Sequence, residues 1–331
     1  MPELDDITYP TLQLDDHLLD EKLPSARPIL TINPDQSPAH ATLGALDILP
    51  LELLDHVLAQ LDLRTVISFR HINRRAAQLV EFSPTYRAIS RHASNALCAA
   101  LNIGCAQWVT CGALYGALCT WKCESCGDFA DYIYLVACAR VCFLCFTSRR
   151  QYLPLRPSHA RRKFGLSGQI VNALPHIRAL PGVYTPREKK LHRVVLVDYA
   201  SARHAGIAHH GSEAAMNRYV EATRVAQVQA YNAKYSASGR SASSAACHTR
   251  PPKLEDPPDE GPWNPFRFAA ICRVPWLNSE TQQVESGFHC LGCKYEIDLP
   301  LNFRREFTRA SFEEHLEDCG PIVDGKHCPG S

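Results

Sequence analysis

The stretch from residue 46 to residue 88 has the strongest periodic pattern in the 331-residue chain, and the pattern predicts helices. Apolar residues recur at spacings of three and four in LDILPLELLDHVLAQL, which places them on one helical face. Asp62 and Asn73 can each cap a further short helix, because their side chains accept hydrogen bonds from unpaired amides of a first turn. Ser83, followed by a proline, predicts a longer helix that ends near Gly104. The sequence therefore predicts three short helices and a longer fourth one.

Three short helices cannot enclose all the apolar residues of this stretch. The first helix is expected to begin at a proline, which is tolerated where the amides lack partners. We therefore expect another polypeptide to cover the remaining apolar surface. The candidate contact residues are Leu49, Pro50, Leu53, Leu54, Val57, Leu58 and Leu61.

Composition limits the classes of protein to which the chain can belong. Hydrophobic residues make up 46% and charged residues 21%, and the net charge is +1, as in ordinary soluble proteins. This charge excludes a polycation that coats nucleic acid, and no run of 18 apolar residues predicts a membrane span. The first residues are acidic and lack the apolar segment of a secretory signal. We therefore expect a cytoplasmic and/or nuclear location, where the 15 cysteines need another explanation than disulfides.

Two CxxC pairs, separated by 15 residues, have the spacing of a four-thiolate zinc site. The candidate ligands are Cys123, Cys126, Cys142 and Cys145. Two sulfurs on one tight turn grip one face of a tetrahedral ion, and the second pair grips the other face. The β-prone run 132–136 predicts a hairpin between the pairs, as in a zinc-ribbon-like insert. The spacing leaves open whether Cys119 or Cys138 replaces one of the four.

A second metal set is predicted near the C-terminus. The candidate ligands are Cys290, Cys293, His315 and Cys319. A capping box of Ser311 and Glu314 would open a helix that carries the histidine and the last cysteine on one face. His327 and Cys328 are interpreted as bystanders. Because protein ligands fill all four positions of each set, we expect structural zinc at both.

Residues 49–75 resemble the F-box family. The resemblance lies in Leu49-Pro50-Leu51-Glu52-Leu53-Leu54, Val57-Leu58-Ala59-Gln60-Leu61, Leu63, Val66, Phe69 and Ile72-Asn73-Arg74-Arg75. The resemblance implies a non-catalytic subunit that binds the Skp-type adaptor of a cullin–RING ubiquitin ligase. It also implies that the rest of the chain captures a protein substrate. The CxxC pairs, with Leu174-Pro175 and 180–184 further on, are similar to segments of fungal F-box proteins of unassigned substrate.

The predicted fold is mainly helical with small β elements, and the chain divides into six segments. These are a disordered acidic tail (1–43), the F-box (44–88), a helical segment with the double CxxC module (89–150), an irregular α+β middle region (151–235), a disordered linker (236–262) and a C-terminal zinc-finger-like module (263–331). The middle region is expected to contain a strand at 194–197 and a helix near 212–231.

Other functions have weaker support in the residues. A zinc-dependent nucleic-acid-binding regulator would use the basic run 149–163, but charge runs usually face water, so nucleic acid is disfavoured as a partner. A RING finger needs eight interleaved ligands, and a thioredoxin-like enzyme uses one CxxC and not two facing pairs. Asp198, Ser201 and His204 lack the nucleophile elbow of a hydrolase. No enzyme is therefore predicted, and the identity of the substrate stays open.

Overall fold

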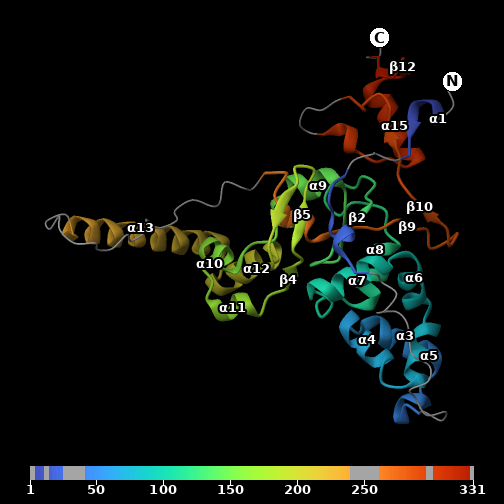
Figure 1. Cartoon of the computed structure of the whole chain (residues 1–331), viewed down its shortest axis with the longest axis horizontal. Coiled ribbons are helices and arrows are strands. Elements are labelled where there is room, and N and C mark those ends of the chain that lie inside the picture. The colour runs from blue at the N-terminus through green and yellow to red at the C-terminus, as the bar shows by residue number, and fades with distance from the viewer. Residues whose placement is uncertain (1–3, 11–14, 25–41, 239–260, 296–300, 329–331) are drawn as a thin grey trace.

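The computed structural model describes residues 4–10, 15–24, 42–238, 261–295 and 301–328. Three arms extend from a central body (Figure 1). One arm holds helices α3 to α5, the second holds α15 with the C-terminal hairpin, and the third is the projecting helix α13. Small antiparallel sheets of two or three strands accompany the helices, in agreement with the predicted mainly helical class. None of the described helices is long and apolar enough to cross a bilayer.

The first arm consists of α3 (Leu51–Gln60), α4 (Leu63–Arg70) and α5 (Arg74–Phe82). The predicted caps are confirmed, because Asp62 accepts a hydrogen bond from the Thr65 amide (3.0 Å) and Asn73 accepts one from the Ala76 amide (2.8 Å). A short 3-10 turn, η3 (Gly44–Ile48), precedes this arm.

The predicted long fourth helix is in fact two helices, α6 (Pro84–His92) and α7 (Ser94–Ile103). Ser83 caps α6, and Gly104 ends α7 with a φ of +80°, as expected. Between them, Ala93 leaves the helical region and is fully buried. The bend lets both helices face one core, which they share with α8 (Cys111–Leu118).

The central body is built around a three-stranded antiparallel sheet. Strand β2 (Tyr132–Tyr134) pairs with β3 (Ala139–Val141) on one side and with β8 (Ile271–Arg273) on the other. The β2–β3 hairpin is the one predicted between the CxxC pairs, and α9 (Phe143–Ser148) and η4 (Arg150–Tyr152) follow it. Strand β8 comes from the segment expected to form a separate C-terminal module. The start of that segment, which includes α14 (Pro265–Phe268), therefore belongs to the central body.

The middle region contains more regular structure than its proline-rich sequence suggested. It begins with α10 (Pro157–Phe164) and α11 (Gly168–Asn172), which are followed by the strand pairs β4 (His176–Ala179) with β7 (Val194–Val197) and β5 (Gly182–Tyr184) with β6 (Lys189–Leu191). The strand predicted at 194–197 is thus present. Helix α12 (Tyr199–His210) precedes α13 (Glu213–Ser238), which runs beyond the predicted end of the helix at 231.

The second arm contains a small independent core around Phe307 and Phe312. Its elements are the pair β9 (Trp276–Leu277) and β10 (Val284–Glu285) at its base, β11 (His289–Cys290), η5 (Asn302–Arg304), α15 (Arg309–Cys319), β12 (Ile322–Val323) and β13 (Lys326–His327). Thr308 caps α15, with Ser311 as the reciprocal partner, so the capping box lies three residues before the predicted one.

Parts of the predicted acidic tail are packed against the body. Helix α1 (Leu4–Ile7) leads into β1 (Thr8–Tyr9), which pairs with β11. Leu19, at the start of η1 (Leu19–Lys22), is fully buried, and Asp16 accepts two hydrogen bonds from Arg304 (2.7 and 2.8 Å). Contacts with buried residues of other segments offset the entropy that these N-terminal residues lose on ordering, which their own composition does not predict. Residues 1–3, 11–14 and 25–41 of the predicted tail, and 239–260 of the predicted linker, lie outside the described residues.

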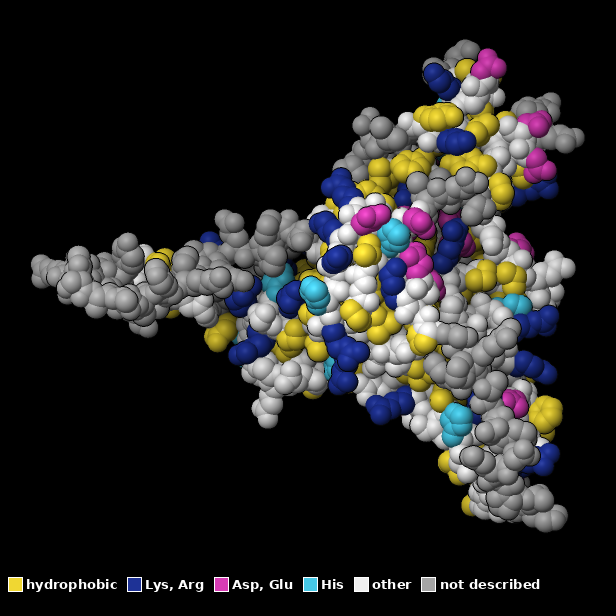
Figure 2. Space-filling model, in the orientation of Figure 1, with side chains coloured by type: hydrophobic (Ala, Val, Ile, Leu, Met, Phe, Trp, Pro, Cys, Tyr) yellow, Lys and Arg dark blue, Asp and Glu magenta, His cyan; other side chains and the backbone are white. Residues whose placement is uncertain are grey.

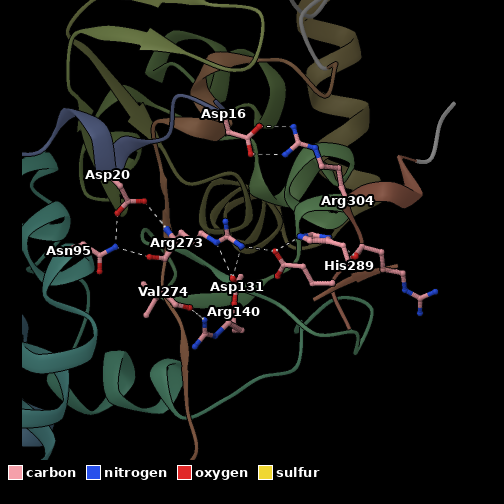
Figure 3. A network of polar contacts seen from close by, with 11 residues as sticks. Asp16, Asp20, Asn95, Asp131, Arg140, Arg273, Val274, His289 and Arg304 are labelled. Carbon is pink, nitrogen blue, oxygen red and sulfur yellow. Dashed lines mark hydrogen bonds and ion pairs between the residues drawn. The ribbon is translucent and has the colours of Figure 1, made fainter. Parts of the chain in front are cut away.

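A buried polar network joins the N-terminal segment, the body and the second arm (Figure 3). Asp20 accepts hydrogen bonds from the Asn95 side chain (2.6 Å) and from the Arg273 amide (2.9 Å). The Arg273 guanidinium in turn donates to Asp131 (3.0 Å) and to Glu306 (3.1 Å). Each carboxylate has a cationic or amide partner, which lowers the cost of its burial, but burial still raises the pKa of all three.

Candidate functional site

Helix α3 divides its apolar residues between two faces. Leu54 and Leu58 are buried against the chain, at 5% and 6% exposure. Leu53 and Val57 lie one turn apart and remain 52% and 45% exposed. Leu49 is 36% exposed before the helix begins. Some of the predicted contact residues therefore pack inside the helical unit, and others expose apolar side chains to solvent. Pro50 is exposed, and Leu61 is half-buried.

The exposed apolar surface extends beyond the predicted residues. Further exposed apolar side chains of this arm are Ile48, Leu51, Ile72 and Phe82. Apolar side chains are visible in yellow on this arm in Figure 2. An exposed apolar surface of this kind marks an interaction site more often than a free surface.

The opposite side of α3 is held firmly by the body. Helix α8 approaches so closely that a Cβ added at Gly112 would lie 2.9 Å from the Ala59 carbonyl oxygen. The Ser83 hydroxyl donates a hydrogen bond to Asp55. These contacts fix the rotation of α3 about its axis, so the side that carries Leu53 and Val57 stays turned outward.

The first cysteine cluster has the geometry of a tetrahedral site. The Sγ atoms of Cys123, Cys126, Cys142 and Cys145 all lie within 4.8 Å of one another. The Cys126 and Cys142 sulfurs are 3.6 Å apart, and a tetrahedral zinc with Zn–S bonds of about 2.3 Å would place two sulfurs about 3.8 Å apart. The four thiols therefore fit zinc by their chemistry and by their spacing.

Local backbone structure positions these thiols. Gly127 adopts a φ of +83°, and its amide donates to the Cys123 carbonyl (2.9 Å), which closes the first turn. Cys142 caps α9, and its sulfur accepts a hydrogen bond from the Cys145 amide (3.4 Å). The β2–β3 hairpin brings the second turn next to the first.

Hydrogen bonds among the four cluster thiols shift their pKa values in opposite directions, lowering that of Cys123 and raising those of Cys126 and Cys142. The positions of the sulfur atoms, and not the pKa values, therefore distinguish the clustered cysteines from their neighbours. Cys119 and Cys138 belong to no metal-like group among the described residues. Burial raises the pKa of both, for Cys138 to about 12. Neither replaces one of the four.

The C-terminal cluster differs from the predicted set in one ligand. The structure groups Cys290, Cys293, His315 and His327 within 4.8 Å. The Nε2 atom of His327 lies 3.2 and 3.4 Å from the two sulfurs, and that of His315 lies 3.5 Å from the Cys293 sulfur. Sulfur and nitrogen ligands of a tetrahedral zinc are about 3.5 Å apart. This donor set fits zinc as well.

Cys319 lies on the wrong side of His315 to join this group. Its sulfur is 3.5 Å from Nδ1 of His315, whereas Nε2 of the same ring faces the cluster. The two ring nitrogens point in different directions, so one ion cannot bind both Cys319 and Nε2. The helical i, i+4 spacing placed the two residues on one face but could not specify which nitrogen faces the other ligands.

His327, interpreted as a bystander from the sequence, is the residue that sequence reasoning missed. Its Nδ1 contacts the Gly320 carbonyl oxygen (2.9 Å), which orients Nε2 toward the sulfurs. It packs over Gly292, where an added Cβ would lie 2.7 Å from the ring. The Asp324-Gly325 turn between β12 and β13 returns the chain to the cluster, and an Asp-Gly pair is a sequence signal for a hairpin.

The residues considered for hydrolysis have structural contacts. Asp198 caps α12 by accepting a hydrogen bond from the Ser201 amide (2.7 Å), and it also accepts one from the Tyr134 hydroxyl (3.0 Å). The Asp198 carboxylate thus contacts the amide of Ser201 and not an imidazole, unlike a catalytic triad.

Comparison with known proteins agrees with the helical unit of the first arm. Residues 46–87 match the family model of the F-box domain. No curated protein and no solved structure matches the chain. The chain therefore contains an F-box domain, the kind of domain that indicates a substrate-receptor role in a ubiquitin ligase.

Proposed function

We propose that the chain is the non-catalytic substrate receptor of a Skp-adaptor/cullin/F-box ubiquitin ligase. One observation carries the proposal, namely that Leu53 and Val57 stay half exposed on a helix whose opposite side is packed and fixed. If other segments of the same chain covered Leu53 and Val57, these side chains could not contact an adaptor. A cytoplasmic and/or nuclear location stays part of this proposal.

The adaptor contact is assigned to the outward side of α3 and to the residues before it. Leu49, Pro50, Leu53 and Val57 are the proposed anchors, because a few apolar side chains dominate such interfaces. Leu54 and Leu58 support them from beneath, and Leu61 ends the helix. Interfaces of permanent complexes commonly bury about 2,000 Å² or more, so the other exposed apolar residues of this arm are expected to contribute.

Both cysteine clusters are proposed to hold structural zinc. Each set supplies four protein ligands and leaves no position for water or substrate. Binding of such an ion is worth about 10–16 kcal/mol in small zinc fingers, which would supply much of the stability of each module. The first zinc would stiffen the central body and the second would stiffen the second arm.

The test is assembly from purified components. The full chain is mixed with a Skp-type adaptor at micromolar concentration, and the mixture is analysed by size-exclusion chromatography. We expect one complex with equal amounts of the two proteins, and a larger complex when a cullin is added. Separate elution of the chain and the adaptor would refute the proposal.

A further inference from the structure

A large cavity lies where α13 leaves the body, between this helix, α10 and the end of α12. Its volume is about 980 Å³. Cationic side chains from two helices line it, namely Arg161, Arg162 and Lys163 on α10 and Arg224 on α13, and His209 of α12 lies beside them. Glu221 is the one acid among its described lining residues. Lys, Arg and His side chains gather at the root of this arm in Figure 2.

Close packing holds the helices around the cavity in fixed positions. Helix α10 ends at Gly165, which has a φ of +63°. A Cβ added there would lie 2.7 Å from Nε2 of His210 and 2.8 Å from the ring of Tyr219, so both side chains pack directly on this turn. The His210 ring also stacks near Tyr219, with centroids 4.6 Å apart. The cations on α10 and α13 are therefore held around one space.

Among the described lining residues, basic side chains outnumber the single acid, Glu221. Arg224 and Glu221 are 3.9 Å apart and both more than half exposed, a pairing that is worth little in water. Arg161 and Arg162 are exposed on α10. A hollow that is lined mainly by one sign of charge concentrates the field and attracts ions of the opposite sign.

The shape of the charged region favours a short anionic group over a polynucleotide. The basic run 149–163 does not form one surface, because Arg149 and Arg150 line a separate cavity beside α12. Arg156 instead lies over the ring of Phe266, 5.3 Å from its centroid. A nucleic acid backbone needs a continuous positive track, whereas one cluster suits one or two anionic groups.

We propose that this cavity binds an anionic segment of the protein substrate, with carboxylate or phosphoryl groups held by Arg161 and Arg162. Planar guanidinium groups bind both kinds of oxyanion through paired hydrogen bonds. Tyr219, which is 52% exposed, offers apolar contact for a neighbouring side chain of the same segment. This inference rests on the proposed receptor function and names the class of segment that the receptor captures.

Fluorescence anisotropy with the full-length chain tests this inference. The probes are a labelled peptide with six glutamates, the same peptide with phosphoserines, a neutral glutamine version and a labelled oligothymidylate. The variant is Arg161→Gln/Arg162→Gln, and the control is Arg178→Gln, an exposed arginine on β4 that lines no described cavity. Circular dichroism confirms that each variant is folded.

We expect both anionic peptides to bind and the neutral one not to bind. The double variant should lower the affinity at least about tenfold, because it removes two charge-assisted contacts, and Arg178→Gln should leave the affinity unchanged. Tighter binding of the phosphoserine peptide would identify phosphoryl groups as the preferred ligand. Failure of both anionic peptides, equal binding by the double variant, or tighter binding of oligothymidylate would overturn the inference. Adaptor co-elution is measured separately, so loss of peptide binding alone would leave the receptor function standing.

Discussion

Leu53→Asp places a carboxylate on the exposed apolar surface of α3. Leu53 is 52% exposed, and full burial of a leucine is worth about 1.5–3 kcal/mol, so adaptor contact can still gain about 1–1.5 kcal/mol from it. An unpaired carboxylate at an apolar interface adds a penalty on the order of 2–3 kcal/mol. We expect the adaptor affinity to fall by about 3–4.5 kcal/mol, or about 150- to 2,000-fold.

Isothermal titration of the Skp-type adaptor into the full chain measures this change. The matched control is Val225→Asp, which introduces the same charge at a 44% exposed position on α13 in a different arm. The control should bind the adaptor like the unmodified chain. Adaptor binding by folded Leu53→Asp with unchanged affinity would refute the reasoning. Unfolding of this variant would refute it too, because Leu53 would then belong to the core.

Three further predictions follow from the buried network and the C-terminal cluster. Asp16→Ala leaves a buried arginine unpaired and should lower the unfolding free energy by about 3–5 kcal/mol in thermal denaturation, whereas exposed Asp15→Ala should change it by about 0.5 kcal/mol or less. His327→Ala should reduce the zinc that survives dialysis against a chelator from two ions per chain to one, by mass spectrometry, and Cys319→Ser should leave it at two. Burial raises the pKa of Glu306 from 4.5 to about 8, so between these values the folded chain keeps a proton that the unfolded chain loses. The stability of the unmodified chain should therefore fall as the pH rises through that window. The melting temperature of Glu306→Gln, measured relative to that of the unmodified chain, should rise between pH 5 and pH 8.

Each of these predictions has a result that contradicts it. Equal melting temperatures for the Asp16 and Asp15 variants would show that the buried ion pair contributes nothing. Loss of zinc from Cys319→Ser but not from His327→Ala would restore the ligand set expected from spacing. A melting-temperature difference between Glu306→Gln and the unmodified chain that stays constant with pH would mean that Glu306 is ionised in the folded state.

The helices of the F-box and the first cysteine cluster could be predicted because their determinants are local. Asp62 and Asn73 cap helices through bonds to amides three residues away. The CxxC turns and the β2–β3 hairpin also join residues that are close in the chain. The division of α3 into a packed side and an exposed side could not be predicted as easily from the sequence, because it depends on where α8 packs.

Contacts between distant segments could not be predicted in the same way. Asp16 and Arg304 are 288 residues apart in the sequence, and the residues next to either of them in the chain do not indicate that the two form an ion pair. The acidic composition of residues 1–43 indicated disorder, yet the described part near Leu19 is buried in the core. Strand β8 joins β2 across the predicted linker, which sequence composition had suggested as a domain boundary.

The sequence by itself determined the elements that are stabilised by contacts between residues close in the chain, namely the capped helices, the tight hairpin and the two CxxC turns of the first cluster. Only the tertiary structure decided which side of α3 faces outward, that His327 and not Cys319 completes the C-terminal cluster, and that cations of α10 and α13 line one cavity. The physical reason is that hydrogen bonds within a turn depend on residue spacing, whereas burial and side-chain direction depend on how separate segments pack.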